Sequence, residues 1–268
     1  MKKTLLVLLT ILLLAGLAGT ANASGDVISC WFPPDWKSKA PQAKAITTAL
    51  SEHSGLNIQP RIAKSYPEIF AAFSADANNM VYVGSFVQAI IKAQDIGTPL
   101  VQNVNGKEHY SGVLIYPKGE NPQTLLAENP AAVAYAVGAS SGESSAKAAT
   151  GGKAAVPTPN HGASIAAVKA DKAKTAVVKN WWWESNREKY PEMAMYEIPG
   201  ISLIKNPDNV LTVSKKMAPE VQEKIKNAAI ASKDAFGAPE MRPLADNDLD
   251  FSLSLMKKGG IDPLTYSW

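Results

Sequence analysis

Short apolar segments alternate with amphipathic segments of helical period along residues 24–268. This alternation is typical of chains whose strands are joined by helices, because each helix carries the chain back across the sheet and covers it. The pattern therefore predicts an α/β fold. The segments that we expect to form strands are 27–31, 56–62, 80–83, 100–104, 110–116, 131–137, 175–178, 195–198 and 210–213.

The expected helices are marked by apolar periodicity and by residues that begin or end helices. In the first of them, Pro41 suits the first turn and Gly55 suits a left-handed C-cap. Residues 138–162 are rich in Gly, Ser, Ala and Pro and predict a loop that leads into a helix. The expected helices are 41–54, 66–73, 86–93, 164–169, 180–190, 219–236 and 249–256.

The first segment predicts export. Lys2 and Lys3 precede the apolar run 5–14, and Ala21-Asn22-Ala23 has the small-x-small pattern that signal peptidase cuts. We expect a signal peptide over 1–23, cleavage after Ala23 and a periplasmic location. No later stretch approaches the ~18 consecutive apolar residues of a membrane span, so we expect a soluble, unanchored protein.

The composition and charge indicate which class of partner the protein binds. The 268 residues are 46% hydrophobic and 19% charged, which suits a folded chain with a sizeable core. Without the leader, 25 Lys and Arg stand against 24 Asp and Glu, and no basic run carries interleaved aromatics. Nucleic acid is therefore a poor candidate partner and a small solute is a better one.

Few residues point to metal, redox or cofactor chemistry. The three histidines lack the spacing of a metal site, so we expect no metal and no cofactor. Cys30 is the single cysteine, which excludes an intramolecular disulfide. No Lys, Arg or His lies close to it in sequence to lower its pKa, which favours a buried, inert thiol. The Lys-rich stretch 169–179 is interpreted as a solvated face. Trp181, Trp182 and Trp183 cannot all point one way, so we expect only part of them in the core.

Several short motifs, in this order, resemble the phosphonate- and phosphite-binding (PhnD-like) periplasmic proteins of ABC transporters, which have the type II periplasmic-binding fold. The resemblance covers nearly all of residues 24–268. The motifs are YPEIFAAF at 66–73, VYVGSF at 81–86, Pro-Leu at 99–100, GKEHYS at 106–111, NHGASIAAV at 160–168, IKNP at 204–207 and VSKKM at 213–217.

The resemblance implies two lobes, each a mixed sheet flanked by helices, joined by a two-segment hinge. Lobe 1 would comprise 24–105 and 203–268, and lobe 2 would comprise 106–202. Ligands of such folds bind between lobes that close by hinge motion, where strand ends and helix N-termini contact them.

The serine cluster at 140–145 is the strongest candidate for an anion site. Ser140, Ser141, Ser144 and Ser145 surround Gly142 and follow an expected strand, where the family carries a Ser-Thr-Ser-Gly run that cradles phosphonyl oxygens. Helix N-termini attract anions through free amides and the helix dipole. Helix capping and a mobile Ser/Gly loop are the alternative interpretations.

Six further residues are candidate ligand contacts, each with a structural alternative. Ser85 opens a helix and can be a simple N-cap. Trp31 and Phe32 end the first strand and, together with the nearby Trp36, either wall the ligand or pack the lobe. The resemblance favours the ligand for the remaining three, which are Tyr66, Tyr110 and His161.

Two departures from the family pattern bear on the ligand. Asn79 and Lys174 stand where the family usually has aspartates. If those acids face the pocket, their loss removes a partner for an aminoalkyl ammonium and favours a ligand without one.

We expect a monomeric receptor that captures a small oxyanion (a phosphonate, phosphite or phosphate ester) for an ABC permease. The alternatives are a sensory protein that docks on a membrane receptor and a binder of an unrelated small metabolite. An enzyme on this fold is less favoured, because no Ser-His-Asp grouping or Gly-x-Ser-x-Gly motif occurs with an interpretable spacing.

Overall fold

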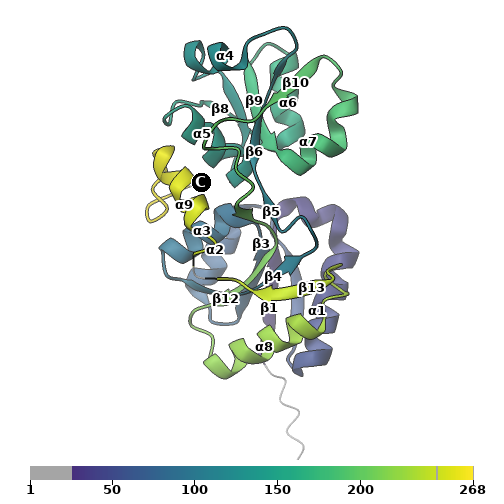
Figure 1. The fold of residues 1–268 in the computed structure, drawn as a ribbon. Coiled ribbons are helices and arrows are strands. Elements are labelled where there is room, and N and C mark those ends of the chain that lie inside the picture. Colours follow the sequence, from purple (N-terminus) through teal and green to yellow (C-terminus); the bar gives the residue numbers. More distant parts are fainter. Residues whose placement is uncertain (1–25, 246, 268) are drawn as a thin grey trace, which may run out of the picture.

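The computed structural model describes residues 26–245 and 247–267, so the expected leader at 1–23 lies outside the described residues. Two sheets, each flanked by helices, form two lobes that stack one above the other (Figure 1). Every helix within those two ranges is too short or too polar to cross a membrane.

Lobe 1 is built on a six-stranded mixed sheet. Strands β1, β2 and β3 run parallel, whereas β12 runs antiparallel to β3 and β4. The chain therefore leaves this lobe after β4 and later returns to the middle of the sheet. In spatial order the strands are β13 (Glu240–Pro243), β4 (Gly97–Val104), β12 (Val210–Ser214), β3 (Asn79–Val83), β1 (Ile28–Phe32) and β2 (Ile58–Ile62).

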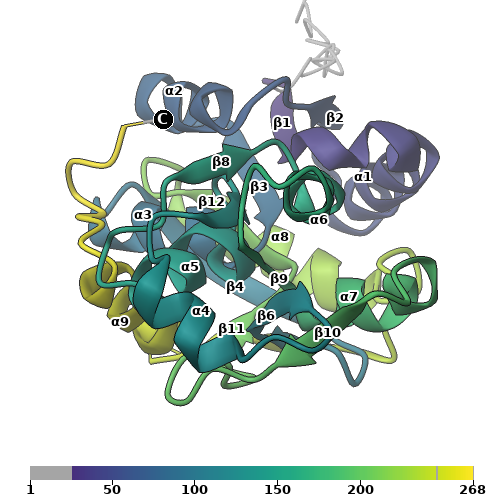
Figure 2. The same cartoon turned by 90° about the horizontal axis from the view of Figure 1, so that it is seen from above.

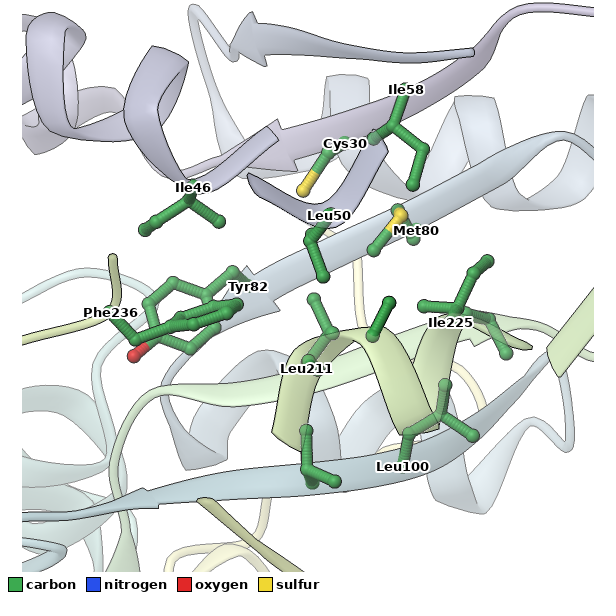
Figure 3. Close-up of a cluster of buried hydrophobic side chains, with 14 of the residues drawn as sticks. Cys30, Ile46, Leu50, Ile58, Met80, Tyr82, Leu100, Leu211, Ile225 and Phe236 are labelled. Carbon is green, nitrogen blue, oxygen red and sulfur yellow. The ribbon is translucent and has the colours of Figure 1, made fainter. Parts of the chain in front are cut away.

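Strand β3 shows why helices cover both faces of this sheet. Met80 and Tyr82 pack in the cluster with α1 and α8, and Val81 and Val83 pack with α2 and α3. Figure 3 shows the first cluster, in which Cys30 is fully buried as predicted, and burial raises the pKa of its thiol. The helices of lobe 1 are η1 (Pro34–Lys39), α1 (Ala40–Ser54), α2 (Tyr66–Ala75), α3 (Ser85–Ala93) and α8 (Pro219–Ala231).

Lobe 2 is built on a five-stranded mixed sheet. Strand β7 runs parallel to β8 and β9, and β6 runs antiparallel to β9 and β10. The strands, in spatial order, are β10 (Met193–Tyr196), β6 (Gly112–Pro117), β9 (Thr175–Lys179), β7 (Val133–Ala136) and β8 (Val156–Thr158). The helices are α4 (Pro122–Glu128), η2 (Ser140–Ser144), α5 (Ser145–Ala149), α6 (His161–Lys169), α7 (Asn180–Asn186) and η3 (Arg187–Lys189).

The two connections between the lobes pair with each other. β5 (His109–Tyr110) leads into lobe 2, β11 (Asn206–Pro207) leads back to lobe 1, and the two form an antiparallel ribbon. The fold is thus the two-lobed arrangement with a two-segment hinge that the resemblance implies. The boundaries at 105/106 and 202/203 stay predictions.

The last helix, α9 (Asp250–Lys258), contacts both lobes. Leu255 packs in the cluster that holds Ala146 of α5, and Met256 packs in the cluster that holds Phe86 and Ile90 of α3. Figures 1 and 2 both show α9 on the side of the molecule where α3 and α5 lie. The C-terminal segment therefore connects the lobes outside the hinge.

Helix α4 and strands β8 and β13 are among the elements that were not predicted, because they carry no periodic apolar signal. Helix α4 is capped by Asn121, whose side chain accepts hydrogen bonds from two backbone amides, but the helix buries no residue. Strands β8 and β13 are short, contain proline and lie at sheet edges, where proline is tolerated.

Several expected elements have different bounds, and two of them show the cause. The strand predicted at 110–116 is interrupted at Ser111, whose amide and carbonyl both bond to Asn180 instead of to a strand partner. The helix predicted at 219–236 ends at Ala231, because 232–236 forms tighter turns that lead to Gly237 in the left-handed region.

Gly142 allows the turn after β7 to fold back against its own strand. A Cβ at this position would lie 2.6 Å from the carbonyl oxygen of Ala136 and 2.9 Å from its amide nitrogen. These neighbours are backbone atoms, so no side-chain rotation can relieve the contact. Gly112 of β6 allows a second close approach to the same turn, because a Cβ at position 112 would lie 2.5 Å from the Cβ of Ser145.

Gly142→Ala is expected to lower the free energy of unfolding by about 1–3 kcal/mol through overpacking. Gly162→Ala in α6 is the matched control, because its nearest atoms would be 3.4 and 3.7 Å away and alanine in a helix stabilises by roughly 0.5–1 kcal/mol. Urea denaturation measures both. An unfolding free energy of the Gly142→Ala variant equal to the wild type would contradict the close-approach argument.

Candidate functional site

A cavity of about 280 Å³ lies between the lobes beside the hinge. Its size is near the lower end of ligand sites, which suits a small solute. Helices α2, α3, η2 and α6 are among those that begin at or next to its lining, where the free amides and the dipole of a helix favour an anion. The polar and charged side chains of the lining, apart from the two tryptophans, are Asp35, Lys39, Tyr66, Tyr110, Ser140, Ser141, His161, Lys179, Asp208 and Asn209.

A chain of buried hydroxyls joins the lobes and the hinge. The oxygens of Tyr110 and Ser85 lie 2.7 Å apart, and Ser85 donates to Ser140 at 2.9 Å. Ser85 has one hydroxyl proton, so if Ser140 receives it, Tyr110 must donate to Ser85. The Ser140 proton is then available to an acceptor in the cavity.

The turn that carries Ser140 is helical and tied in place. Ser145 donates to the carbonyl of Ser140 at 2.6 Å. The buried carboxylate of Glu143 accepts from the amide of Gly138 and from the hydroxyl of Tyr266, both at 2.9 Å, and pairs with Lys147 at 3.2 Å. The cluster at 140–145 is therefore an ordered helix start rather than an unstructured loop.

The structure brings five of the ten predicted site residues to the cavity lining and one just behind it. Ser85 lies behind the lining and is connected to it by the hydroxyl chain. The residues on the lining are Tyr66, Tyr110, Ser140, Ser141 and His161.

Four predicted site residues lie away from the lining. Ser145 is buried and bonds back to its own turn, and the Ser144 hydroxyl is buried without a hydrogen bond. Phe32 belongs to the core of lobe 1 and contacts Trp36 at a ring distance of 4.8 Å. Trp31 donates to Asn79 at 2.8 Å and packs on the opposite face of the sheet.

Trp36 and Trp182 are the tryptophans of the cavity wall. Trp36 follows the Pro33-Pro34 turn, so the wall begins a few residues beyond the end of the first strand. The three tryptophans at 181–183 point in different directions, as expected: Trp183 is in the core, and Trp181 donates to the carbonyl of His109 at 2.9 Å.

His161 begins α6 with its ring beside Trp182, at a centroid distance of 5.9 Å. Its Nε2 lies 3.5 Å from the Ser141 hydroxyl, and its buried Nδ1 has no hydrogen-bond partner. Burial and, secondarily, the charge of Lys179 lower the pKa of His161 from 6.5 to about 4. His161 is therefore neutral at neutral pH and presents one N–H donor.

The charged residues of the cavity were missed by sequence reasoning. Lys179, at the end of the stretch interpreted as a solvated face, forms an ion pair with Asp208 and lies 4.3 Å from the centroid of the Tyr110 ring. Lys39 lies 5.3 Å from the ring of Trp36. Lys179 and Asp208 adjoin the ends of expected strands, which is the signal that could have identified them.

Asp35 is the second carboxylate of the lining. Burial raises its pKa, opposed by a backbone hydrogen bond and by the charge of Lys39. Within the described ranges, no three His, Cys, Asp or Glu side chains gather as a metal site requires.

The premise of the argument from Asn79 and Lys174 does not hold, because neither residue lines the cavity, and the ligand class expected from it stays a prediction. Asn79 bonds to Trp31 and to the carbonyl of Ala72, and Lys174 pairs on the surface with Asp171. The carboxylates that line the cavity are Asp35 and Asp208, so these two residues, and not positions 79 and 174, bear on the charge of the ligand.

The lowered pKa of His161 predicts a stability loss in acid. The unfolded chain binds a proton at His161 below about pH 6.5 and the folded protein does so only near pH 4, so the free energy of unfolding falls between these values. His161→Gln removes this contribution and should retain more stability at pH 4.5 relative to pH 7. The measurement is urea denaturation at both pH values, with His53→Gln as the control because His53 is exposed at the end of α1. An equal loss of stability in acid by the wild type, the His161→Gln variant and the His53→Gln variant would contradict the prediction.

A family model described as "ABC transporter, phosphonate, periplasmic substrate-binding protein" matches residues 37–248. No curated protein sequence matches the chain.

Solved structures share the fold at low sequence identity. XAC2383 from Xanthomonas citri bound to ATP is 12% identical with a TM-score of 0.68, and 87% of this chain covers 97% of that one. PhnD1 from Prochlorococcus marinus in complex with methylphosphonate is 14% identical with a TM-score of 0.66 and the same coverage. A binding protein component of an ABC phosphonate transporter from Pseudomonas aeruginosa is 13% identical with a TM-score of 0.62, and 87% of each chain is covered.

The family model spans most of the chain, and the cavity between the two lobes is lined by helix N-termini and hydroxyls. The chain therefore belongs to the phosphonate-type periplasmic substrate-binding proteins of ABC transporters.

Proposed function

We propose that this protein captures a small phosphonate, phosphite or phosphate ester in the cavity between its lobes and delivers it to an ABC permease. The hydroxyl chain from Tyr110 through Ser85 to Ser140 is the observation that carries the proposal. It supplies a proton donor at the start of a helix, beside the first-turn amides, where an oxyanion is best stabilised.

Neutral donors surround the proposed anion position. The hydroxyl of Ser141 lies near neutral His161, and the amides of Ser140 and Ser141 precede the first hydrogen bond of the η2 turn, in which Gly142 donates to the carbonyl of Ala139. Hydrogen bonds to a charged acceptor are about twice as strong as neutral ones. The site therefore favours an oxyanion with several acceptor oxygens.

Closure of the lobes contributes to the same bonds. Ser85 belongs to lobe 1 and Ser140 to lobe 2, so their bond forms only when the lobes approach. Ligand capture and closure then support each other, because closing removes water from the donors that bind the anion.

Cleavage after Ala23 and a monomeric state belong to the same proposal. The charge pattern and small-x-small motif at the N-terminus support the cleavage. The proposed ligand cavity forms within one chain, which supports a monomer, since its lining needs no second copy.

The test is a thermal-shift and calorimetric panel on residues 24–268. The probes are methylphosphonate, phosphite, phosphate, sulfate, ATP and a neutral sugar. A ligand that binds only the folded state stabilises it by about 2.7 kcal/mol at a hundredfold excess over Kd, and this stabilisation raises the Tm. We expect a shift with at least one phosphorus oxyanion and none with the sugar.

Two variants locate the binding. Ser141→Ala and Tyr110→Phe are each expected to weaken the affinity for the best oxyanion about 10- to 100-fold. Ser141→Ala removes a charge-assisted hydrogen bond to the ligand, and Tyr110→Phe removes the hydroxyl that orients the Ser85 and Ser140 protons. Ser144→Ala is the matched control, since that hydroxyl lies on the same turn, away from the lining and without a hydrogen bond. Unchanged affinity in both site variants, or a loss in the control as large as theirs, would refute the proposed site.

A further inference from the structure

The cavity contains a cation site that the chain fills with its own lysine. The ammonium of Lys179 is hydrogen-bonded to the Asp208 carboxylate and lies 4.3 Å from the centroid of the Tyr110 ring. A carboxylate combined with an aromatic face is the chemistry that recognises an ammonium group.

Three separate parts of the chain build this cation site. Lys179 ends β9 of lobe 2, Asp208 follows β11 on the return to lobe 1, and Tyr110 belongs to hinge strand β5. All three line the ligand cavity. The two charged side chains retain only 23% and 19% of their exposure, so the pair is largely removed from water.

Asp208 is held firmly at this position. Its amide donates to the carbonyl of Glu108 at 2.9 Å, and its carbonyl accepts from the side chain of Gln102 at 3.4 Å. A Cβ on Gly84 would lie 3.3 Å from the second carboxylate oxygen, so lobe 1 packs closely against it. The backbone of Asp208 is thus fixed beside the cavity, and its carboxylate lies between Lys179 and Gly84.

We propose that Lys179 selects the charge of the ligand: it occupies the position that a ligand ammonium would take, so the protein binds phosphonates that lack a cationic group and rejects aminoalkyl phosphonates. This inference rests on the proposed function and specifies its ligand class. Lys179 is a specificity-determining residue.

The selection follows from the charges that face Lys179. A ligand ammonium entering beside Asp208 would meet the like charge of Lys179, and displacing the lysine would leave a largely buried cation without its partner. Asp35 also lines the cavity, within electrostatic reach of Asp208 and Lys179. The positive charge of Lys39 offsets the negative charge of Asp35. Neutral His161 adds no charge at neutral pH.

Removing the lysine charge should reverse the selection. Lys179→Met keeps most of the aliphatic stem and leaves the Asp208 carboxylate and the Tyr110 ring unoccupied. A ligand ammonium can then take the vacated position and neutralise a carboxylate that is otherwise buried and unpaired.

Ethylphosphonate and 2-aminoethylphosphonate are suitable probes, because they share the phosphonate and the two-carbon chain and differ in the ammonium group. Calorimetry on the wild type is expected to give at least tenfold tighter binding of ethylphosphonate. In Lys179→Met the ratio of the two Kd values should move by at least tenfold toward the aminated ligand, whereas Lys179→Arg should keep the wild-type preference.

Two controls separate charge selection from a structural role of the ion pair. Lys39→Met removes the other lysine of the lining and should change the Kd of both ligands by a similar factor, leaving their ratio nearly unchanged. In the double variant Lys179→Met with Asp208→Asn, the gain for the aminated ligand should disappear, because the carboxylate that receives its ammonium is gone.

Equal binding of the two probes by the wild type would overturn the inference and leave the proposed function intact. A Lys179→Met variant that weakens both ligands alike would assign the ion pair to hinge structure alone and also overturn it. If the wild type binds neither probe nor any oxyanion of the panel, both the inference and the proposed function fail.

Discussion

Tyr110, Ser85 and Ser140 share a chain of hydrogen bonds in which the three hydroxyls come from the hinge, lobe 1 and lobe 2. All three are buried, and a buried hydroxyl without a partner costs about 1–3 kcal/mol. Because they satisfy one another only in the closed arrangement, the relative position of the lobes and the direction of the Ser140 proton are set together. The close approach allowed by Gly142 and the bonds of Glu143 fix the turn that presents this proton.

The site divides into a neutral part and a charged part. The neutral part, made of serines, first-turn amides and His161, can stabilise an oxyanion without a cation in contact with it. The charged part, Lys179 with Asp208, is already balanced within the protein. The donor geometry therefore selects the anionic end of the ligand, and the internal ion pair selects the charge of the rest of the ligand.

The sequence was informative wherever a local pattern determines structure. Alternating apolar segments predicted most strands, and the Gly55 cap and the buried Cys30 follow from local chemistry. The ordered motifs pointed to the family, and Tyr66, Tyr110, Ser140, Ser141 and His161 do line the cavity.

The rest depends on contacts between distant segments. Lys179 and Asp208 are 29 residues apart and meet only through the sheet and hinge, so a lysine at the end of a charged stretch was interpreted as solvated. The argument from Asn79 and Lys174 lost its premise for the same reason, because motif position does not say which face a side chain occupies. Trp31 and Phe32 also show this, since a strand sends successive residues to opposite faces and the turn after it carries Trp36 to the cavity.

The most direct test of the central claim is a crystal structure of residues 24–268 grown with methylphosphonate. The account predicts a tetrahedral group between the lobes, with its oxygens within hydrogen-bond distance of the hydroxyls of Ser140 and Ser141, the first amides of η2 and His161, and with the Lys179–Asp208 pair intact. A ligand bound elsewhere, or one whose oxygens contact Lys39 and leave the serine turn empty, would contradict it.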